Sequence, residues 1–247
     1  MTLSMSFITS GTKNNYQVGE YLQYRIHYGL LNAGFASLTI NNSNYDGRPH
    51  FHMVGEGSSS GAVRAFYKID DRYETFIDAS TGTPTKFIRN INEGGYKRFQ
   101  VTTFDHKNKT AKIEDRLKNK TNFYNFEKDI QDLISAFYYL RNHDTDNLKN
   151  GDFMSIDVMM ADGVYNFKLK VLGRETMKTK FGTVNTIKFR PFVQSGRVFK
   201  ESESVTMWVT DDKNHIPVQI KAELSVGSLK ADLHNYKNLK YPTSFTK

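Results

Sequence analysis

The stretch from Ser204 to Tyr236 constrains the fold more than any other part of the chain, because it reads as three short strands joined by two turns. In each strand apolar and polar residues alternate with a period of two, which is typical of a β-strand with one buried face. The turns are the polar cluster at 211–214 and the segment around Gly227. Pro217 has no N–H for a ladder, so we expect it at a strand start or edge. The stretch predicts an antiparallel meander with one apolar face.

The rest of the chain is also rich in short β-forming runs separated by turn signals, which brings the predicted total to roughly twelve strands. Residues 127–142 differ, because their apolar residues recur at helical spacing and predict the one major helix, with Asn125 as its N-cap. A short helix is expected at 62–67, capped by Ser59 or Ser60. We therefore predict a β-rich α+β fold: a strongly curved antiparallel sheet or open β-barrel, with the major helix packed on it or in its mouth.

A chain of 247 residues suits one large β domain, which we expect to span residues 16–242. Residues 1–15 begin with a short run of apolar and small residues and then become polar. We interpret them as the remnant of a signal peptide and a flexible tail, the alternative being a plain polar terminus. No later run approaches the roughly 18 apolar residues of a membrane span. These features favour an exported protein of the periplasm.

One hairpin plan occurs twice, each time as a strand, an Asp, a turn, a Pro, a strand and a Gly. The two sets have identical spacing and are Asp78, Pro84, Gly94 and Asp211, Pro217, Gly227. This plan resembles an element of the LolA/LolB-type periplasmic lipoprotein carriers. Those carriers are half-closed β-barrels around an apolar cavity plugged by helices, so the resemblance implies an apolar cavity here.

A wider resemblance covers most of the chain. The segments that carry it are 19–38, 66–78, 132–141, 173–189 and 207–233. They resemble the DUF3108 family, a bacterial and typically exported family of unknown function. The resemblance implies an exported β-rich protein, and it supplies no catalytic residues.

Charge and cysteine content narrow the possible partners. The net charge is +8, from 34 Lys and Arg against 26 Asp and Glu, and the chain has no cysteine. A diffuse positive field suits peripheral contact with an anionic membrane or acidic ligands. Without a nucleic-acid-binding motif, we expect no nucleic-acid partner. The lack of cysteine excludes disulfides, zinc–thiolate sites and thiol nucleophiles, and we expect no cofactor.

Catalytic and metal-binding patterns are weak. His50 and His52 share one strand face and could form half of a metal site, but no further ligand is evident. Asp70–Asp71 and Asp211–Asp212 are adjacent carboxylates, but neighbours on a strand point to opposite faces, so neither pair forms a dyad by itself. A hydrolase would need Asp71, His27 or Asp212 to converge in one cleft. We therefore expect no catalytic residue.

Binding residues are easier to nominate. Arginine forks bind phosphate or carboxylate headgroups bidentately, although pairing with nearby aspartates would explain them equally. Aromatic side chains on the inner face of a curved sheet could line an apolar hollow. The candidates for ligand binding are Arg64, Arg72, Arg141, Tyr24, Tyr28 and Phe137.

The leading hypothesis is a non-enzymatic binding or carrier module for a lipid, a lipoprotein or another apolar envelope ligand. It requires an unfilled apolar hollow inside the sheet. One alternative is a structural or assembly protein of the envelope with an unknown protein partner. The other is a hydrolase of envelope glycans or esters.

Overall fold

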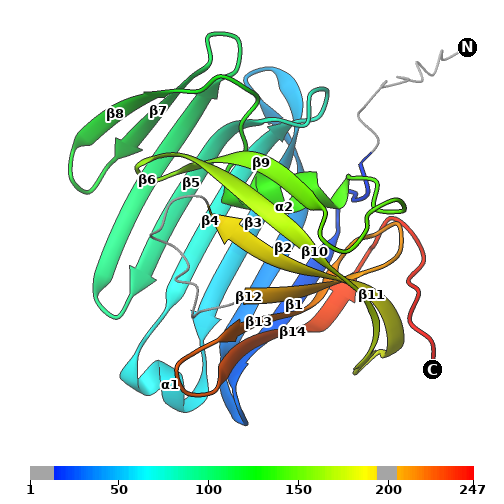
Figure 1. Ribbon diagram of the computed structural model, residues 1–247. Coiled ribbons are helices and arrows are strands. Elements are labelled where there is room, and N and C mark those ends of the chain that lie inside the picture. Colours follow the sequence, from blue (N-terminus) through cyan, green and yellow to red (C-terminus); the bar gives the residue numbers. More distant parts are fainter. Residues whose placement is uncertain (1–13, 194–204) are drawn as a thin grey trace, which may run out of the picture.

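The computed structural model describes residues 14–193 and 205–247, whose strands form a single antiparallel sheet (Figure 1). The order across the sheet is β8-β7-β6-β5-β4-β3-β2-β1-β14-β13-β12-β11-β10-β9. Strands that are consecutive in the chain therefore lie side by side, except β8 and β9, and the β1–β14 pair joins two meanders.

The first meander comprises β1 (Tyr21–Tyr28), β2 (Leu31–Tyr45), β3 (Arg48–Ser59), β4 (Asp70–Asp78), β5 (Pro84–Glu93), β6 (Tyr96–Asp105), β7 (Thr110–Asp115) and β8 (Lys120–Asn125). The second comprises β9 (Phe153–Met160), β10 (Gly163–Thr179), β11 (Gly182–Val193), β12 (Val205–Thr210), β13 (Pro217–Glu223) and β14 (Ser228–Lys237). Helix α1 (Gly61–Phe66) lies between β3 and β4, and α2 (Leu133–Arg141) lies between β8 and β9.

The sheet curls without closing, because β8 and β9 are its two edges. Helix α2 contacts β3, β4 and β9, so it lies inside the curl between the two walls (Figure 1). This confirms the predicted curved antiparallel sheet with one major helix. The predicted meander is confirmed in β12, β13 and β14, and Pro217 opens β13 as expected. Ser204 lies outside the described residues.

The prediction that α2 begins at residue 127 with Asn125 as its N-cap is wrong. Asp132 is the N-cap, and its carboxylate accepts the N–H groups of Ile134 and Ser135 at 2.8 and 2.9 Å. Residues just before it join the sheet instead: Gln131 bridges to β9 in parallel, donating its N–H to the Asp157 carbonyl. The free edge of β9 satisfies backbone groups that a longer helix would have used.

The core fills the concave side. Ile134 packs against the sheet at Gly55, where any side chain would meet its Cδ1 atom. Tyr138 is fully buried beside it. The sheet residues of this cluster are apolar side chains from β2 to β7, namely Ile40, Met53, Ile77, Phe87, Phe104 and Ile113. The concave face is thus covered by α2 where the sheet is most apolar.

Both ends of the described chain are anchored beyond the predicted domain limits of 16 and 242. Asn15 donates hydrogen bonds to the Asn142 side chain and to the Arg141 carbonyl, both at 2.7 Å. Thr246 forms a backbone bridge with Thr183. Residues 1–13, which carry most of the segment interpreted as a signal-peptide remnant, lie outside the described residues.

The repeated hairpin plan is visible in three dimensions. In both copies the register shifts at the residue just after the proline, and the proline pairs as Ile77↔Pro84 and as Val209↔Pro217. Helix α1 follows its predicted N-cap Ser60, although the Ser60 side chain makes no capping hydrogen bond. Strand β8 was not predicted, because its sequence, KTNFYN, is mostly polar.

Candidate functional site

Two of the three candidate arginines are already paired at the surface. Arg64 makes a bidentate salt bridge to Asp70, with nitrogen–oxygen distances of 2.7 and 3.0 Å. Arg72 donates to Glu74 at 3.0 Å and also to Glu56. The Asp70 carboxyl has a lowered pKa, chiefly because Arg64 hydrogen-bonds to it. Both guanidinium groups are therefore largely neutralised by neighbours.

The third arginine is buried. Arg141, in the last turn of α2, makes a bidentate salt bridge to Glu20 at 2.5 and 3.0 Å, and both side chains are buried. Its Nε donates to the Asn214 carbonyl at 2.9 Å. This cation ties α2 to the start of the sheet and to the β12–β13 turn.

Two of the three aromatic candidates meet in the core near Arg141: Phe137 packs against the cluster that contains Tyr24, and the Arg141 guanidinium lies over the Phe137 ring at 5.8 Å. Tyr24 is buried, and its hydroxyl has no hydrogen-bond partner among the described residues; burial raises its pKa. Phe137 is partly buried where two core clusters meet. Tyr28 is partly exposed at the end of β1, and its hydroxyl donates to the Val226 carbonyl at 2.7 Å. The six candidates are thus divided between core and surface.

His50 and His52 each have a partner other than a metal. His50 is buried, and its Nδ1 lies 2.8 Å from the Arg48 carbonyl oxygen. His52 pairs with Glu74 at 2.8 Å and stacks on Phe76, with ring centroids 4.4 Å apart. Within residues 14–193 and 205–247, no three His, Asp or Glu side chains are grouped to hold a metal ion.

The residues that a hydrolase would need lie on separate elements. His27, on β1, pairs with Asp232 at 2.7 Å. Asp71, on β4, accepts a backbone N–H from β5 at 2.9 Å. Asp212 caps the β12–β13 turn by accepting the N–H of Asn214 at 2.9 Å. Each carboxylate has its own structural partner, and no shared cleft brings the three together.

An apolar cavity lies beside α2 in the described part of the chain. It has a volume of about 50 Å³ and is lined mainly by Phe137, Leu140, Met154, Leu169, Phe189 and Met207. Pockets for small molecules measure roughly 300–1,000 Å³. A larger hollow of about 360 Å³ is lined mostly by polar and charged residues of β1 to β4, including Glu56 and Arg72. The expected unfilled apolar hollow is therefore not found in this part of the chain, because α2 and its neighbours fill the space.

Exposed apolar side chains gather instead at one end of the sheet. Successive hairpin turns of an antiparallel meander alternate between its two ends. The turns on the side of β1–β2 carry Leu30, Phe66 and Val226, which are 100%, 91% and 77% exposed. We call this surface the apolar end and define it as residues 28–31, 60–69, 93–98 and 223–230; it lies at the bottom of Figure 1.

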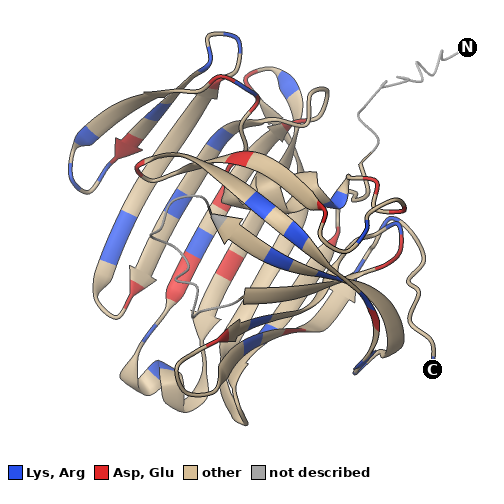
Figure 2. Cartoon of the chain, viewed as in Figure 1, with Lys and Arg blue, Asp and Glu red and all other residues tan. Residues whose placement is uncertain are grey.

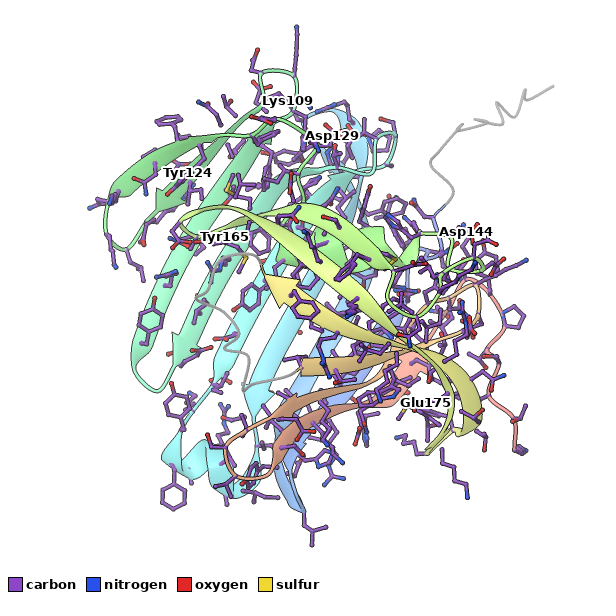
Figure 3. The ribbon with its side chains drawn as sticks, viewed as in Figure 1. Lys109, Tyr124, Asp129, Asp144, Tyr165 and Glu175 are labelled. Carbon is purple, nitrogen blue, oxygen red and sulfur yellow. The ribbon has the colours of Figure 1, made fainter. Side chains whose placement is uncertain are left out.

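The opposite end is polar. Within the described chain, the turns β2–β3, β4–β5, β6–β7, β10–β11 and β12–β13 carry no exposed large apolar side chain. A salt bridge of 2.7 Å between Lys109 and Asp129 lies at that end (Figure 3). Figure 2 shows charged bands on the turns of both ends, so the two ends differ in their exposed apolar side chains and not in the presence of charge.

The four segments of the apolar end touch one another in the order of the strands. The Tyr28 hydroxyl joins β1 to the β13–β14 turn through the Val226 carbonyl. The Asn32 side chain donates to the Ser60 hydroxyl at 2.9 Å, which joins the start of β2 to the segment that carries α1. The Gly94 N–H donates to the Lys68 carbonyl at 2.8 Å, which joins that segment to the β5–β6 turn. The four segments of the apolar end therefore lie next to one another along this end of the sheet.

Two glycines support tyrosine rings on this surface. Gly94 and Gly227 have φ angles of 52° and 73°, a region that favours glycine. A Cβ atom at Gly94 would overlap the ring of Tyr67, and one at Gly227 would overlap that of Tyr28. In both copies of the repeated hairpin plan, the glycine therefore leaves space for a tyrosine ring to pack over the turn.

Sequence reasoning missed this surface. The signal was present as apolar residues inside predicted turns, such as Leu30 after Gly29 and Val226 before Gly227. Turn residues are usually polar, so bulky apolar residues at turn tips were a signal from which this surface could have been predicted.

The geometry defines a class: a curled, open antiparallel sheet whose interior is filled by a helix. Within that class, the chain belongs to the DUF3108 family of proteins of unknown function, whose model matches residues 23–234.

Three solved structures are similar to this chain at low sequence identity, and the first of them shares the fold. A β-barrel-like protein of the domain of unknown function DUF1849 from Brucella abortus is 12% identical, with a TM-score of 0.58, covering 90% of this chain and 98% of its own. An inferred exported protein with a YmcC-like fold from Bacteroides fragilis is 10% identical, with a TM-score of 0.36, covering 92% and 100%. An inferred lipoprotein from Parabacteroides distasonis is 12% identical, with a TM-score of 0.34, covering 92% and 100%.

No curated protein matches the chain significantly. Within the described ranges, neither helix has the length and hydrophobicity needed to span a membrane.

Proposed function

We propose that this protein is an exported, non-enzymatic binding module of the cell envelope. It holds an amphiphilic ligand, such as a lipid or the acylated end of a lipoprotein, against the apolar end of its sheet. The observation that carries the proposal is the segregation of exposed apolar side chains onto the turns of one end. Contiguous exposed apolar surface on a soluble domain marks a site of interaction.

In this proposal the ligand binds on the surface of the protein and not inside a cavity. An acyl chain needs far more room than the cavity of about 50 Å³ beside α2. The apolar end offers exposed Leu, Val, Phe and Tyr side chains that water covers in the free protein. Covering each of these side chains with a lipid chain would contribute a binding free energy of about 25 cal/mol per Å² of apolar area removed from water.

A binding role fits the residues better than hydrolysis does. His27, Asp71 and Asp212 lie on different elements, and each is committed to its own partner. General acid–base chemistry needs its groups within hydrogen-bond reach of one reacting atom. That requirement favours a module that leaves its ligand unchanged.

Native mass spectrometry with lysophosphatidylglycerol below its critical micelle concentration tests the proposal. We expect a one-to-one complex whose lipid keeps its mass after prolonged incubation. The double variant L30S/F66S should lose the complex, and F123S, which alters a similarly exposed phenylalanine on β8, should keep it. Absence of any complex would refute binding, and cleavage of the ester would favour the hydrolase. The periplasmic location is proposed together with the function and is checked by cell fractionation.

A second candidate is an assembly protein, and strand β8 favours it. This strand is an edge of the sheet with no partner strand on its outer side among the described residues, and Phe123 on it is 72% exposed. An extended peptide could add to such an edge. If a partner peptide adds to this edge, a cross-linker attached to β8 should capture it. Substituting Thr121 or Asn122 by Pro should abolish that cross-link, because one of the two residues directs its N–H outward and proline has no N–H to donate.

A further inference from the structure

The shape and charge of the apolar end indicate which kind of surface the protein binds. We propose that this end docks on an anionic lipid bilayer, with the tips of its turns inserted in the interface and the polar end facing away. This inference rests on the proposed function, since a bilayer is where an amphiphilic ligand would be collected or delivered.

The most exposed apolar residues stand on separate turns. Leu30 lies in the β1–β2 turn, Phe66 in α1 and Val226 in the β13–β14 turn, and each is at least three-quarters exposed. A protein partner would need a matching pocket for each of these tips. The acyl region of a bilayer is fluid, so it accommodates separate tips at any spacing. Side chains of this kind bury their apolar groups at the boundary between headgroups and acyl chains.

Tyrosines lie close behind the tips. Tyr28, Tyr67 and Tyr96 are 39%, 48% and 48% exposed, so each ring has one face on the protein and part of its surface in solvent. Tyrosine is enriched at membrane–water interfaces, because its ring is apolar and its hydroxyl is polar. The layering of tips in front and tyrosines behind matches the layering of acyl chains and headgroups.

The charge of the apolar end selects the kind of bilayer. The segments 28–31, 60–69, 93–98 and 223–230 hold five Lys and Arg residues against two Glu residues, and Asp70 at their border pairs with Arg64 and Lys68, which leaves a net charge of +2. Lys97 and Lys230 make no salt bridge to any described residue, so their charges are available to headgroups. Basic side chains near an anionic surface are attracted to it within about a Debye length. A second copy of this chain would bring the same positive charge, which opposes self-association.

Flotation with lipid vesicles tests the docking. We expect the wild-type protein to bind vesicles of phosphatidylcholine and phosphatidylglycerol, to bind pure phosphatidylcholine more weakly, and to dissociate as salt is raised. Burying a Leu or Phe side chain is worth enough for about tenfold in affinity. L30S and F66S should therefore each weaken binding by about tenfold, while F123S should leave it unchanged. K97Q/K230Q should weaken binding to the anionic vesicles alone.

A fluorescent probe reports insertion directly. The chain has one tryptophan, Trp208, which is buried, so its emission should not shift on vesicles. F66W adds a second tryptophan at a tip, and we expect its emission to shift to the blue with anionic vesicles. F123W is the matched control and should not shift. Phe66 and Phe123 are exposed, so we expect F66W and F123W to fold like the wild type, and circular dichroism checks this.

The outcomes separate the two proposals. The docking proposal would be overturned if the wild-type protein did not bind anionic vesicles. It would also be overturned if the L30S and F66S variants bound them as well as the wild type. If lysophosphatidylglycerol still forms its complex, the proposed function stands without the bilayer contact. If neither assay shows binding, both proposals fall.

Discussion

The N-cap of α2 makes stability depend on pH in an unusual direction. Asp132 is fully buried, and burial raises its pKa from 3.8 to about 6. Hydrogen bonds from Thr75 and from the first turn of α2 oppose this rise without cancelling it. The folded protein therefore binds a proton at Asp132 more tightly than the unfolded chain does.

The sign and size follow from linkage. Stability from this group is fully present below pH 3.8 and is lost as pH rises through about 6. A shift of about two units, at about 1.4 kcal/mol each, corresponds to roughly 3 kcal/mol. Asp132→Asn removes the titration and keeps a capping side chain. Relative to wild type, the free energy of unfolding of D132N should rise by roughly 3 kcal/mol between pH 3.5 and pH 7.5.

Urea unfolding followed by the fluorescence of Trp208, at intervals of one pH unit, measures this difference. Asp78→Asn is the matched control. Burial opposes ionisation of Asp78, but hydrogen bonds from Ser80 and the charge of Arg48 outweigh it and lower its pKa. D78N should therefore lose stability relative to wild type as pH rises toward 3.8 from below. Parallel curves for wild type and D132N would refute the assignment of a raised pKa.

Three further changes test the packing by urea unfolding. Arg141→Met leaves Glu20 buried without its partner and should cost about 3–5 kcal/mol, and a cost below about 1 kcal/mol would show that water reaches the pair. Gly94→Ala should cost about 1 kcal/mol or more, because its φ is positive and a tyrosine ring lies over it; Gly57→Ala, in open space, should cost less. Ile134→Ala should cost about 2–5 kcal/mol, and a loss near zero would place this helix face outside the core.

Strand positions and hairpin ends were largely predictable, because they depend on neighbours in the sequence. Alternation in the closing meander and the proline at 217 located β12, β13 and β14. The spacing shared by the two hairpins predicted the same turn plan, and the structure also shows the same register shift just after each proline. Strand β8 escaped because its polar sequence carries little period.

The binding residues were harder to predict, because their roles depend on partners far away in the chain. Arg141 looked like a ligand contact, yet Glu20, 121 residues earlier, occupies its guanidinium. The start of α2 moved because a distant strand, β9, offered its free edge to Gln131. Periodicity describes a segment in isolation and contains neither fact.

The sequence by itself determined the strands, their turns and the family, since alternation, glycine and proline act within a few residues. Only the tertiary structure decided which charges pair, how completely the interior is filled, and that the apolar turn residues share one end. The physical reason is that burial and pairing depend on what distant segments bring together. Leu30, Phe66 and Val226 become one surface only when the sheet places their turns side by side.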